Sequence, residues 1–351
     1  MLVNFHVRDR TMEKENIFSF KTSKRAPFVL RMVLFFFVMA FGVYICYVSL
    51  RQIKPNNTPL VVGKAGTHCD IHSIPPEETP FVHFPQPRTY SRAECACTPV
   101  RFFVILSMQR SGSGWFETLL NSHPNISSNG EIFSSKQRRS NISSILTTLD
   151  TIYNLEWNSS AAKNECVAAV GFKWMLNQAV MDYHQQIANY FKWKGVSVII
   201  LFRKNLLRRL ISVLANVFDK DAKQLNGTHK SHVHTKEEAE ILARYKPTIN
   251  VTGLLPDLSH AERIMADSLQ YFNRTRHIIL YYEDLINNHR VKTALADVQE
   301  FLKVPIRRLT SRQVKIHTKP PAEQVDNWED VYKILKDTRY EHFLHHTDYN
   351  T

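Results

Sequence analysis

An uncharged run of nineteen residues, Met32–Leu50, constrains this chain more than any other feature of its sequence. As a helix rising 1.5 Å per residue, such a run is about 30 Å long, which matches the hydrocarbon thickness of a bilayer. The run does not fit a cleaved signal peptide, because the apolar region of such a peptide is shorter and lies nearer the start of the chain. A helix in the core of a soluble domain is also not expected, because Phe35, Phe36 and Phe37 follow one another and leave the helix without a polar face. The run therefore predicts one transmembrane helix.

The charges that flank this run predict its orientation. Residues 1–31 carry seven Lys and Arg against three Asp and Glu, whereas only Arg51 and Lys54 follow the run closely. Basic residues concentrate on the cytosolic side of membrane spans. We therefore expect a single-pass, type II membrane protein with a cytosolic tail over 1–31, a transmembrane helix over 32–50 and the rest of the chain in the secretory lumen.

Two features that follow the run fit a lumenal environment. Seven Asn-x-Ser/Thr triplets, acceptors for N-linked glycan, begin at Asn56, Asn125, Asn141, Asn158, Asn226, Asn250 and Asn273. Four cysteines also follow the run: Cys69, Cys95, Cys97 and Cys166. Two disulfides with three possible pairings are therefore allowed. The close spacing of Cys95 and Cys97 does not suit a zinc clamp, so we expect no metal site.

The net charge predicts an anionic partner. The chain carries +13, of which the tail accounts for +4, so the expected lumenal part carries +9. Such a surplus attracts nucleotides, sulfated or carboxylated glycans, or a membrane surface. We do not expect nucleic acid as a partner in a secretory compartment.

Hydrophobic patterning predicts a stem over 51–99, which is rich in Pro, His and Thr, and a folded domain over 100–351. Buried strands are expected at Arg101–Ser107, Val167–Lys173, Val196–Phe202 and His277–Tyr282. Helices are expected at Trp115–Ser122, Gln178–Phe191, Leu206–Phe218 and Val291–Leu302. Alternating strands and helices indicate an α/β fold with an open, mostly parallel sheet flanked by helices, whose ligands bind beyond the carboxyl ends of the strands.

The sharpest motif joins the first expected strand to the first expected helix and reads Ser107-Met-Gln-Arg-Ser-Gly-Ser-Gly-Trp-Phe116. A small-residue loop that enters a helix points backbone N–H groups at an anion. The phosphate loop of nucleotide hydrolases adds a lysine and a metal-binding hydroxyl after its last glycine. Here Trp115 follows Gly114, and a cation, Arg110, precedes the loop instead. The motif predicts an anion site without a metal.

This Arg-Ser-Gly-Ser run resembles the 5′-phosphosulfate loop of sulfotransferases, which reads Lys-Ser-Gly-Thr-Thr-Trp in cytosolic members and Arg-Ser-Gly-Ser-Ser in many carbohydrate members. The resemblance implies a P-loop-like sulfotransferase fold and 3′-phosphoadenosine 5′-phosphosulfate (PAPS) as the donor. It implies donor-binding roles for Arg110, Ser111, Gly112, Ser113, Gly114 and Trp115. Gly114 departs from the family pattern, in which a hydroxyl residue is usual at this place.

A second motif, Leu201–Ser212, resembles the 3′-phosphate site of the same family. Arg203 at the strand end would grip a phosphate with two hydrogen bonds, and Ser212 in the following helix would donate another. The two residues are nine apart, whereas eight is usual in the family. Arg208 or Arg209 is therefore open as a further contributor.

The remaining candidates concern catalysis and the later part of the chain. Glu131 lies where carbohydrate and bacterial-type sulfotransferases often carry a glutamate, so it is the candidate general base, with a surface carboxylate as the alternative. Lys173, at a strand end, would add positive charge near the leaving phosphate. Tyr281–Leu285, Asn327–Asp330 and Tyr340–Phe343 resemble weaker family segments, which extend the resemblance over about residues 100–345.

The resemblance implies an enzyme that transfers a sulfuryl group from PAPS to a hydroxyl group. The expected lumenal location and the carbohydrate-type loop favour a glycan acceptor in the Golgi lumen, and tyrosyl peptides or lipids stay open as acceptors. Two other classes of protein stay open. One is a Golgi glycosyltransferase that uses Asp219-Lys220-Asp221 as a metal-binding D-x-D triplet. The other is a non-enzymatic protein that binds anions or glycans.

Overall fold

The computed structural model describes residues 32, 35–45, 74–157 and 166–345, and the chain divides into two units, Met1–Gly66 and Thr67–Thr351. In the first unit, residues 35–45 are helical. Among the described residues, no helix combines the length and the hydrophobicity that crossing a membrane requires. The expected cytosolic tail, and part of the span expected over 32–50, lie outside the described residues.

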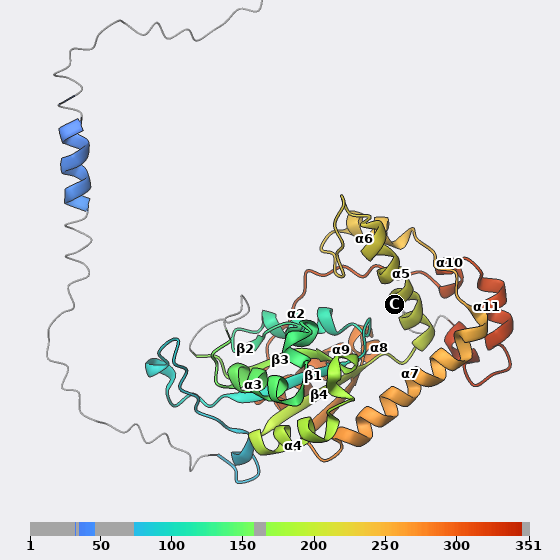
Figure 1. Ribbon diagram of the computed structural model, residues 1–351, viewed down its shortest axis with the longest axis horizontal. Helices are drawn as coiled ribbons and strands as arrows, with labels where there is room; N and C mark the ends of the chain where they lie inside the picture. Colours follow the sequence, from blue (N-terminus) through green and yellow to red (C-terminus); the bar gives the residue numbers. More distant parts are fainter. Residues whose placement is uncertain (1–31, 33–34, 46–73, 158–165, 346–351) are drawn as a thin grey trace, which may run out of the picture. The chain divides into compact units, whose positions relative to one another are not determined.

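The second unit is built on a parallel sheet of five strands (Figure 1). The strands are β1 (Arg101–Ser107), β2 (Ile126–Ser128), β3 (Ala169–Met175), β4 (Val196–Phe202) and β5 (His277–Tyr281). Their order is β2-β3-β1-β4-β5, and every neighbouring pair is parallel. The expected open parallel α/β sheet is thus confirmed. Because the chain extends the sheet on both sides of β1, the carboxyl end of β1 is a place where such sheets bind ligands.

The helices of the second unit connect these strands and follow the last one. They are α2 (Ser113–Ser122), α3 (Ile142–Tyr153), α4 (His184–Lys194), α5 (Leu206–Ala222), α6 (Lys236–Ala243), α7 (Val251–Phe272), α8 (Tyr282–Ile286), α9 (Val291–Phe301), α10 (Pro321–Gln324) and α11 (Trp328–Leu335). Several begin where a polar side chain accepts a hydrogen bond from the first turn. Such caps are Asn141, Asn205, Thr235 and Asn250.

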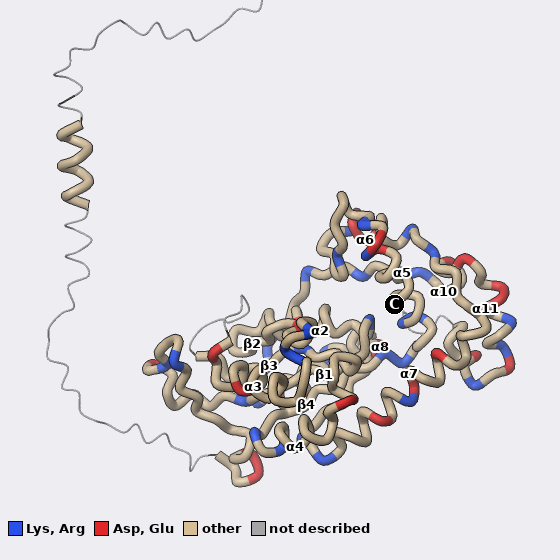
Figure 2. The backbone as a smooth tube through the Cα atoms, viewed as in Figure 1, with Lys and Arg blue, Asp and Glu red and all other residues tan. Residues whose placement is uncertain are grey.

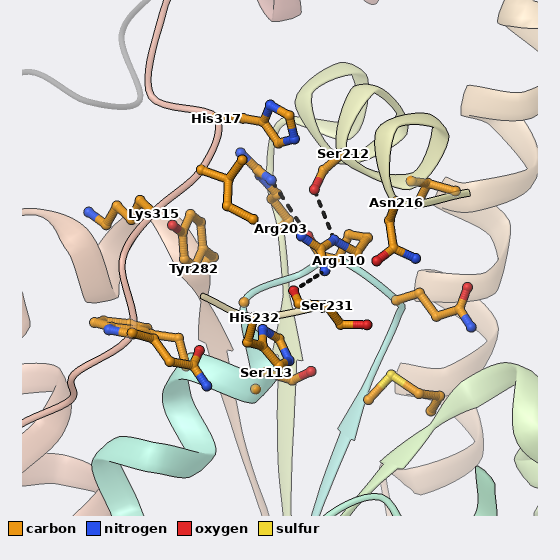
Figure 3. A pocket seen from close by; sticks show the side chains of 18 of the residues that line it. Arg110, Ser113, Arg203, Ser212, Asn216, Ser231, His232, Tyr282, Lys315 and His317 are labelled. Carbon is orange, nitrogen blue, oxygen red and sulfur yellow. Dashed lines mark hydrogen bonds between the residues drawn. The ribbon is translucent and has the colours of Figure 1, made fainter. Parts of the chain in front are cut away.

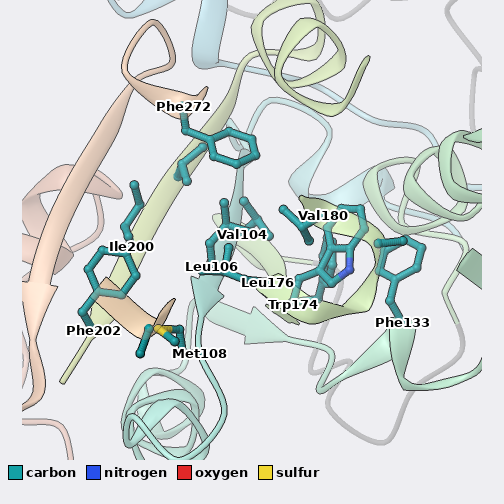
Figure 4. Packing of buried hydrophobic residues seen from close by; sticks show 14 of the residues in the cluster. Val104, Leu106, Met108, Phe133, Trp174, Leu176, Val180, Ile200, Phe202 and Phe272 are labelled. Carbon is teal, nitrogen blue, oxygen red and sulfur yellow. The ribbon is translucent and has the colours of Figure 1, made fainter. Parts of the chain in front are cut away.

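Alternate residues of β1 enter two hydrophobic clusters, because successive side chains of a strand point to opposite faces of the sheet. Phe102, Val104 and Leu106 pack in the larger cluster with side chains from α3, α4 and α7. Phe103 and Ile105 pack in the smaller cluster with side chains from α2 and α9. Figure 4 shows part of the larger cluster. Helices thus cover both faces of the sheet, which explains why β1, β3 and β4 are buried along their whole length.

Two expected elements differ from the structure. The strand predicted over Val167–Lys173 runs two residues later, and the helix predicted to start at Gln178 starts at His184. Between them the chain makes a turn in which Gln178 has φ −103° and ψ 58° and Ala179 has a left-handed φ of 66°. A left-handed residue cannot continue a right-handed helix, so the apolar pattern alone placed the helix start too early.

The described part of the expected stem packs against the amino-terminal side of the sheet. The carboxylate of Glu78 lies 3.4 Å from an Nη atom of Arg101 and 3.2 Å from one of Arg276. The His83 ring stacks on Phe102 with the ring centres 4.1 Å apart. These contacts fasten the segment before β1 to the folded domain.

A disulfide between Cys95 and Cys166 links the same segment to the chain just before β3. Cys97 is also disulfide-bonded. Cys69, the fourth cysteine of the expected lumenal set, lies outside the described residues. Of the pairings left open by the sequence, only one that joins Cys95 to Cys166 agrees with the structure.

Candidate functional site

A cavity of about 280 Å³ opens at the carboxyl ends of β1, β3, β4 and β5 (Figure 3). Its walls include nearly all of the site residues expected from the sequence. These are Arg110, Gly112, Ser113, Gly114, Trp115, Glu131, Lys173, Arg203 and Ser212. Ser111 does not line this cavity, because its side chain is fully buried behind the loop. The fold thus brings residues from the carboxyl ends of different strands to one place.

The loop between β1 and α2 presents backbone donors to this cavity. Arg110 and Gly112 have left-handed φ values of 63° and 82°, which turn the chain from the end of β1 into the start of α2. The first N–H groups of an α-helix have no partner within the helix, and together with the helix dipole they favour an anion. A side chain at Gly112 would also collide with Tyr282, since an added Cβ would lie 2.3 Å from its Cδ2.

Arg110 joins the expected 5′ and 3′ sites. Its Nε donates a hydrogen bond of 2.9 Å to Ser212 Oγ, and its Nη1 donates one of 2.8 Å to the carbonyl of Ser231. Arg203 Nη1 donates to the carbonyl of Arg110 at 3.5 Å, and Arg203 Nε lies 3.9 Å from Glu283 Oε1. Two cations from different strand ends therefore meet on one wall of the cavity (Figure 3).

The pKa values of basic groups around this wall are lowered. Burial and then the charge of Arg203 lower the pKa of Arg110 to about 10, and the same causes lower the pKa of Arg209 to about 10. Burial, Arg110 and Arg203 lower the pKa of His317 to about 4. Burial is the main cause of all three shifts, and repulsion from neighbouring cations adds to it, because several basic groups lie close together here. A bound anion would offset this repulsion.

The segment between α9 and α10 adds to the positive charge. Residues 303–319 contain six Lys and Arg and no Asp or Glu. Figure 2 shows basic positions along this stretch. Its central part, Gln313–His317, lines the cavity, and burial and Arg203 lower the pKa of Lys315. The segment therefore extends the anion-attracting wall beyond the loop.

Lys173 reaches the cavity between two carboxylates. Its Nζ lies 3.6 Å from Glu117 Oε2 and 3.5 Å from Glu131 Oε2. Glu117 is buried and is held in place, since its Oε1 accepts hydrogen bonds from Ser128 Oγ at 2.6 Å and from the N–H of Gly130 at 2.9 Å. Glu117 thus positions Lys173 from behind.

Glu131 is the more accessible of the two carboxylates. Its side chain is 33% exposed, against 10% for Glu117, and it lines the cavity. Its Oε1 accepts a hydrogen bond of 2.5 Å from Gln178 Nε2. The turn at Ala179 is what aims Gln178 at this carboxylate instead of continuing a helix. The geometry leaves Glu131 within reach of a molecule in the cavity.

The other sequence candidates lie outside the cavity wall. Arg208 and Arg209 are not among the described residues that line it, and Arg208 Nη1 donates to the carbonyl of Lys319 at 3.0 Å. Asn327 exchanges two hydrogen bonds with the backbone of Ile249, both 2.9 Å long. Arg208 and Asn327 therefore support the fold around the site.

Glu283 and Asp219, from two further motifs, also make internal contacts. Glu283 accepts hydrogen bonds from the N–H groups of Lys204 at 2.9 Å and Asn205 at 3.2 Å, and burial raises its pKa. It therefore fixes the turn from β4 into α5. Asp219, from the D-x-D triplet, is buried in α5, and its Oδ2 lies 2.7 Å from His229 Nδ1.

Several residues of the wall were not predicted from the sequence: Ser231, His232, Tyr282, Lys315 and His317. The first two belong to the polar stretch after α5, whose histidines were the only available signal. No local pattern indicates that this stretch folds back onto the loop after β1.

Comparison with known proteins gives four findings. A family model described as a sulfotransferase domain matches residues 101–342. Nodulation protein H of Rhizobium meliloti is 24% identical over 256 residues, covering 70% of this chain and 96% of that protein. Nodulation protein H of Rhizobium tropici is 25% identical over 251 residues, covering 69% and 92%. A solved sulfotransferase domain from the curacin biosynthetic pathway covers 64% of this chain and 82% of its own, with 15% identity and a TM-score of 0.32. All residues that line the cavity fall within the matched range.

Proposed function

Because this chain belongs to the sulfotransferase-domain family, we propose that it transfers a sulfuryl group from PAPS to a hydroxyl group of a carbohydrate. One observation carries the proposal. Arg110 and Arg203 meet at the start of α2, in a cavity that Lys173 and Lys315 also line, and such a cluster of cations favours an anion. A nucleotide with phosphates at its 3′ and 5′ positions supplies two such anionic groups.

In this proposal Arg110, Ser113 and the backbone of Gly112–Trp115 hold the 5′-phosphosulfate. Arg203 and Ser212 hold the 3′-phosphate. Arg110 contacts Ser212 directly, so occupation of one subsite would alter the hydrogen bonding of the other. The chemistry needs no metal, because the basic side chains and the helix terminus supply the countercharge.

Transfer then proceeds by in-line displacement at sulfur. Glu131 accepts the proton of the acceptor hydroxyl, whose oxygen forms the new S–O bond. The S–O bond to the 5′-phosphate breaks, and its electron pair stays on the phosphate oxygen. Arg110 and the loop N–H groups stabilise this growing negative charge, and Lys173, which pairs with Glu131, adds a second cation.

We further propose that the acceptor is a glycan and that the reaction takes place in the Golgi lumen, with the chain anchored by residues 32–50. The support is the carbohydrate-type loop, the uncharged run, the basic tail before it and the seven sequons after it. The D-x-D alternative is less well supported, because Asp219 is buried and lies against His229.

Nucleotide binding by the full-length chain tests the proposal. We expect 3′-phosphoadenosine 5′-phosphate to bind and a nucleoside-diphosphate sugar not to bind. Incubation with PAPS and a panel of glycans, tyrosyl peptides and lipids should then add a sulfate to a glycan, detected by mass spectrometry. Binding of the sugar nucleotide alone would reverse the assignment, and sulfation of only peptides or lipids would reject the glycan.

A further inference from the structure

His232 occupies the space that a side chain at position 114 would fill. Gly114 is the second residue of α2 and, unlike Gly112, has no left-handed φ. A Cβ added there would lie 2.2 Å from Nε2 and 2.4 Å from Cε1 of His232. Glycine at 114 therefore leaves room for the His232 ring, whereas the backbone conformation there does not call for glycine. The His232 ring, carried by the α5–α6 loop (residues 223–235), rests against the first turn of α2 (Figure 3).

Neighbours on both sides fix His232 in the α5–α6 loop. On one side, the carbonyl of Ser231 accepts a hydrogen bond of 2.8 Å from Arg110. On the other side, Val233 is fully buried, and its carbonyl accepts a hydrogen bond of 2.9 Å from the N–H of Val314. These two contacts to different parts of the site hold the backbone of the loop in place on either side of His232.

A chain of side chains also ties the α5–α6 loop to α5. Asp219 Oδ2, at the buried end of α5, lies 2.7 Å from His229 Nδ1. His229 Nε2 lies 3.1 Å from Ser231 Oγ. Because α5 also carries Ser212, the loop and the 3′ subsite share one support.

The surroundings of His232 are cationic. The residue keeps an accessible surface in the cavity, but partial burial of its ring, together with the charges of Arg110, Lys173 and His234, lowers its pKa to about 4. The imidazole is therefore neutral at pH 7 and offers one N–H donor. A neutral imidazole can lie beside Arg110 and Lys173 without adding to the electrostatic repulsion between these two cations. Its N–H group can still donate a hydrogen bond to an anion.

On the basis of the proposed function, we infer that His232 helps to bind PAPS, the sulfuryl donor. Its imidazole donates a hydrogen bond to the 5′-phosphosulfate held at the start of α2. It thereby replaces the side chain that Gly114 lacks. The α5–α6 loop is then a wall of the donor site and not only a connection between helices.

The test compares two nucleotides that differ at the 5′ position. Calorimetry on the full-length chain would measure binding of 3′-phosphoadenosine 5′-phosphate and of adenosine 3′-phosphate. His232→Ala should weaken the first by at least about tenfold, the loss of one hydrogen bond to a charged group, and leave the second unchanged. His234→Ala, on the same loop but outside the cavity wall, is the matched control and should change neither.

A pair of substitutions gives a second readout. Gly114→Ser alone should weaken binding of the 5′-phosphate, because its Cβ would collide with His232. The combined variant Gly114→Ser/His232→Ala has room for the hydroxyl and should bind within a few-fold of wild type.

Three results would overturn the inference while the proposed function stands. They are wild-type affinity of His232→Ala for 3′-phosphoadenosine 5′-phosphate, tighter binding by that variant, or equal loss for both nucleotides. Failure of the wild-type chain to bind 3′-phosphoadenosine 5′-phosphate would instead remove the proposed function itself.

Discussion

Arg110 is the residue through which the loop after β1, the 3′ subsite and the α5–α6 loop meet, because it contacts Ser212, Ser231 and Arg203. Arg110→Ala should reduce sulfuryl transfer below about a tenth of the wild-type rate, because the 5′-phosphosulfate would lose its main cation. Initial rates with saturating acceptor would measure this effect. Arg209→Ala is the control, since it removes a nearby cation that does not line the cavity.

Equal losses in these two variants would mean that the general positive field, and not a contact from Arg110, holds the donor. A correctly folded Arg110→Ala variant that retains more than a tenth of its activity, equivalent to less than about 1.4 kcal/mol, would contradict the loop assignment. Thermal unfolding of each variant would show whether the fold is intact.

Glu131 and Arg203 should separate chemistry from donor recognition. Glu131→Gln keeps the shape of the side chain but removes its ability to accept a proton, so turnover should fall by on the order of 10² to 10⁴. Its affinity for 3′-phosphoadenosine 5′-phosphate should stay near wild type. Arg203→Ala should weaken nucleotide binding first. Calorimetry with this nucleotide, together with initial rates, distinguishes the effects of the two substitutions. Similar losses of nucleotide affinity in both variants would mean that Glu131 supports the donor site and that another residue is the base.

At the scale of elements, the sequence predicted those strands whose apolar runs are long and buried on both faces. Arg101–Ser107 and Val196–Phe202 were predicted with the observed bounds. β2 was missed because Ile126–Ser128 is too short to carry a pattern. The start of α4 was misplaced because one left-handed residue, Ala179, interrupts an otherwise helical sequence.

The site was predictable to the extent that it lies at strand ends next to a recognisable loop. Arg110 and Arg203 follow strands that the sequence predicted, so their meeting follows from a parallel sheet, whereas Glu131 follows the missed strand β2 and was proposed from the family resemblance. His232 and His317 reach the same cavity from connections whose paths depend on tertiary packing. No periodicity or spacing in the sequence encodes that return.

The disulfide that joins the segment before β1 to the segment before β3 should stabilise the domain. Cys95 and Cys166 are 71 residues apart, so their bond restricts a long loop of the unfolded chain. Replacing both with Ser should lower the free energy of unfolding by about 2–4 kcal/mol. Denaturant unfolding of the double variant beside wild type would measure this. An unchanged unfolding midpoint would mean that the remaining contacts alone hold the segment in place.

The segment before β1 should also make stability sensitive to acid. Burial, opposed by a backbone hydrogen bond and reinforced by Lys194 and Arg101, lowers the pKa of His83 to about 4. In the unfolded chain the imidazole of His83 becomes protonated as the pH falls below the ordinary pKa of about 6.5. In the folded chain it becomes protonated only near pH 4. Stability should therefore fall as the pH drops through this window, and His83→Gln should reduce that loss. Equal pH dependence of unfolding in both proteins would contradict the prediction.

At the scale of the whole molecule, the exposure of the sequons determines which of them we expect to carry glycan. Asn141, Asn226, Asn250 and Asn273 are exposed, whereas Asn125 is partly buried. The carbonyl of Asn125, which follows α2, also accepts hydrogen bonds from the N–H groups of Ala168 and Ala169 at the start of β3. A bulky glycan requires an open surface, so the exposed group should be modified in preference to Asn125.

Expression of the full-length chain in a eukaryotic host tests this expectation together with the membrane topology. Glycosidase treatment should increase gel mobility, because residues 51–351 would have passed through the secretory lumen. Mass spectrometry should find the deglycosylated asparagines among the exposed sequons. Protease added to sealed microsomes should remove only the tail before Met32, since the bilayer would protect the domain that holds the cavity. An unshifted band, together with digestion of that domain from the cytosolic side, would place the site in the cytosol and overturn the proposed anchor.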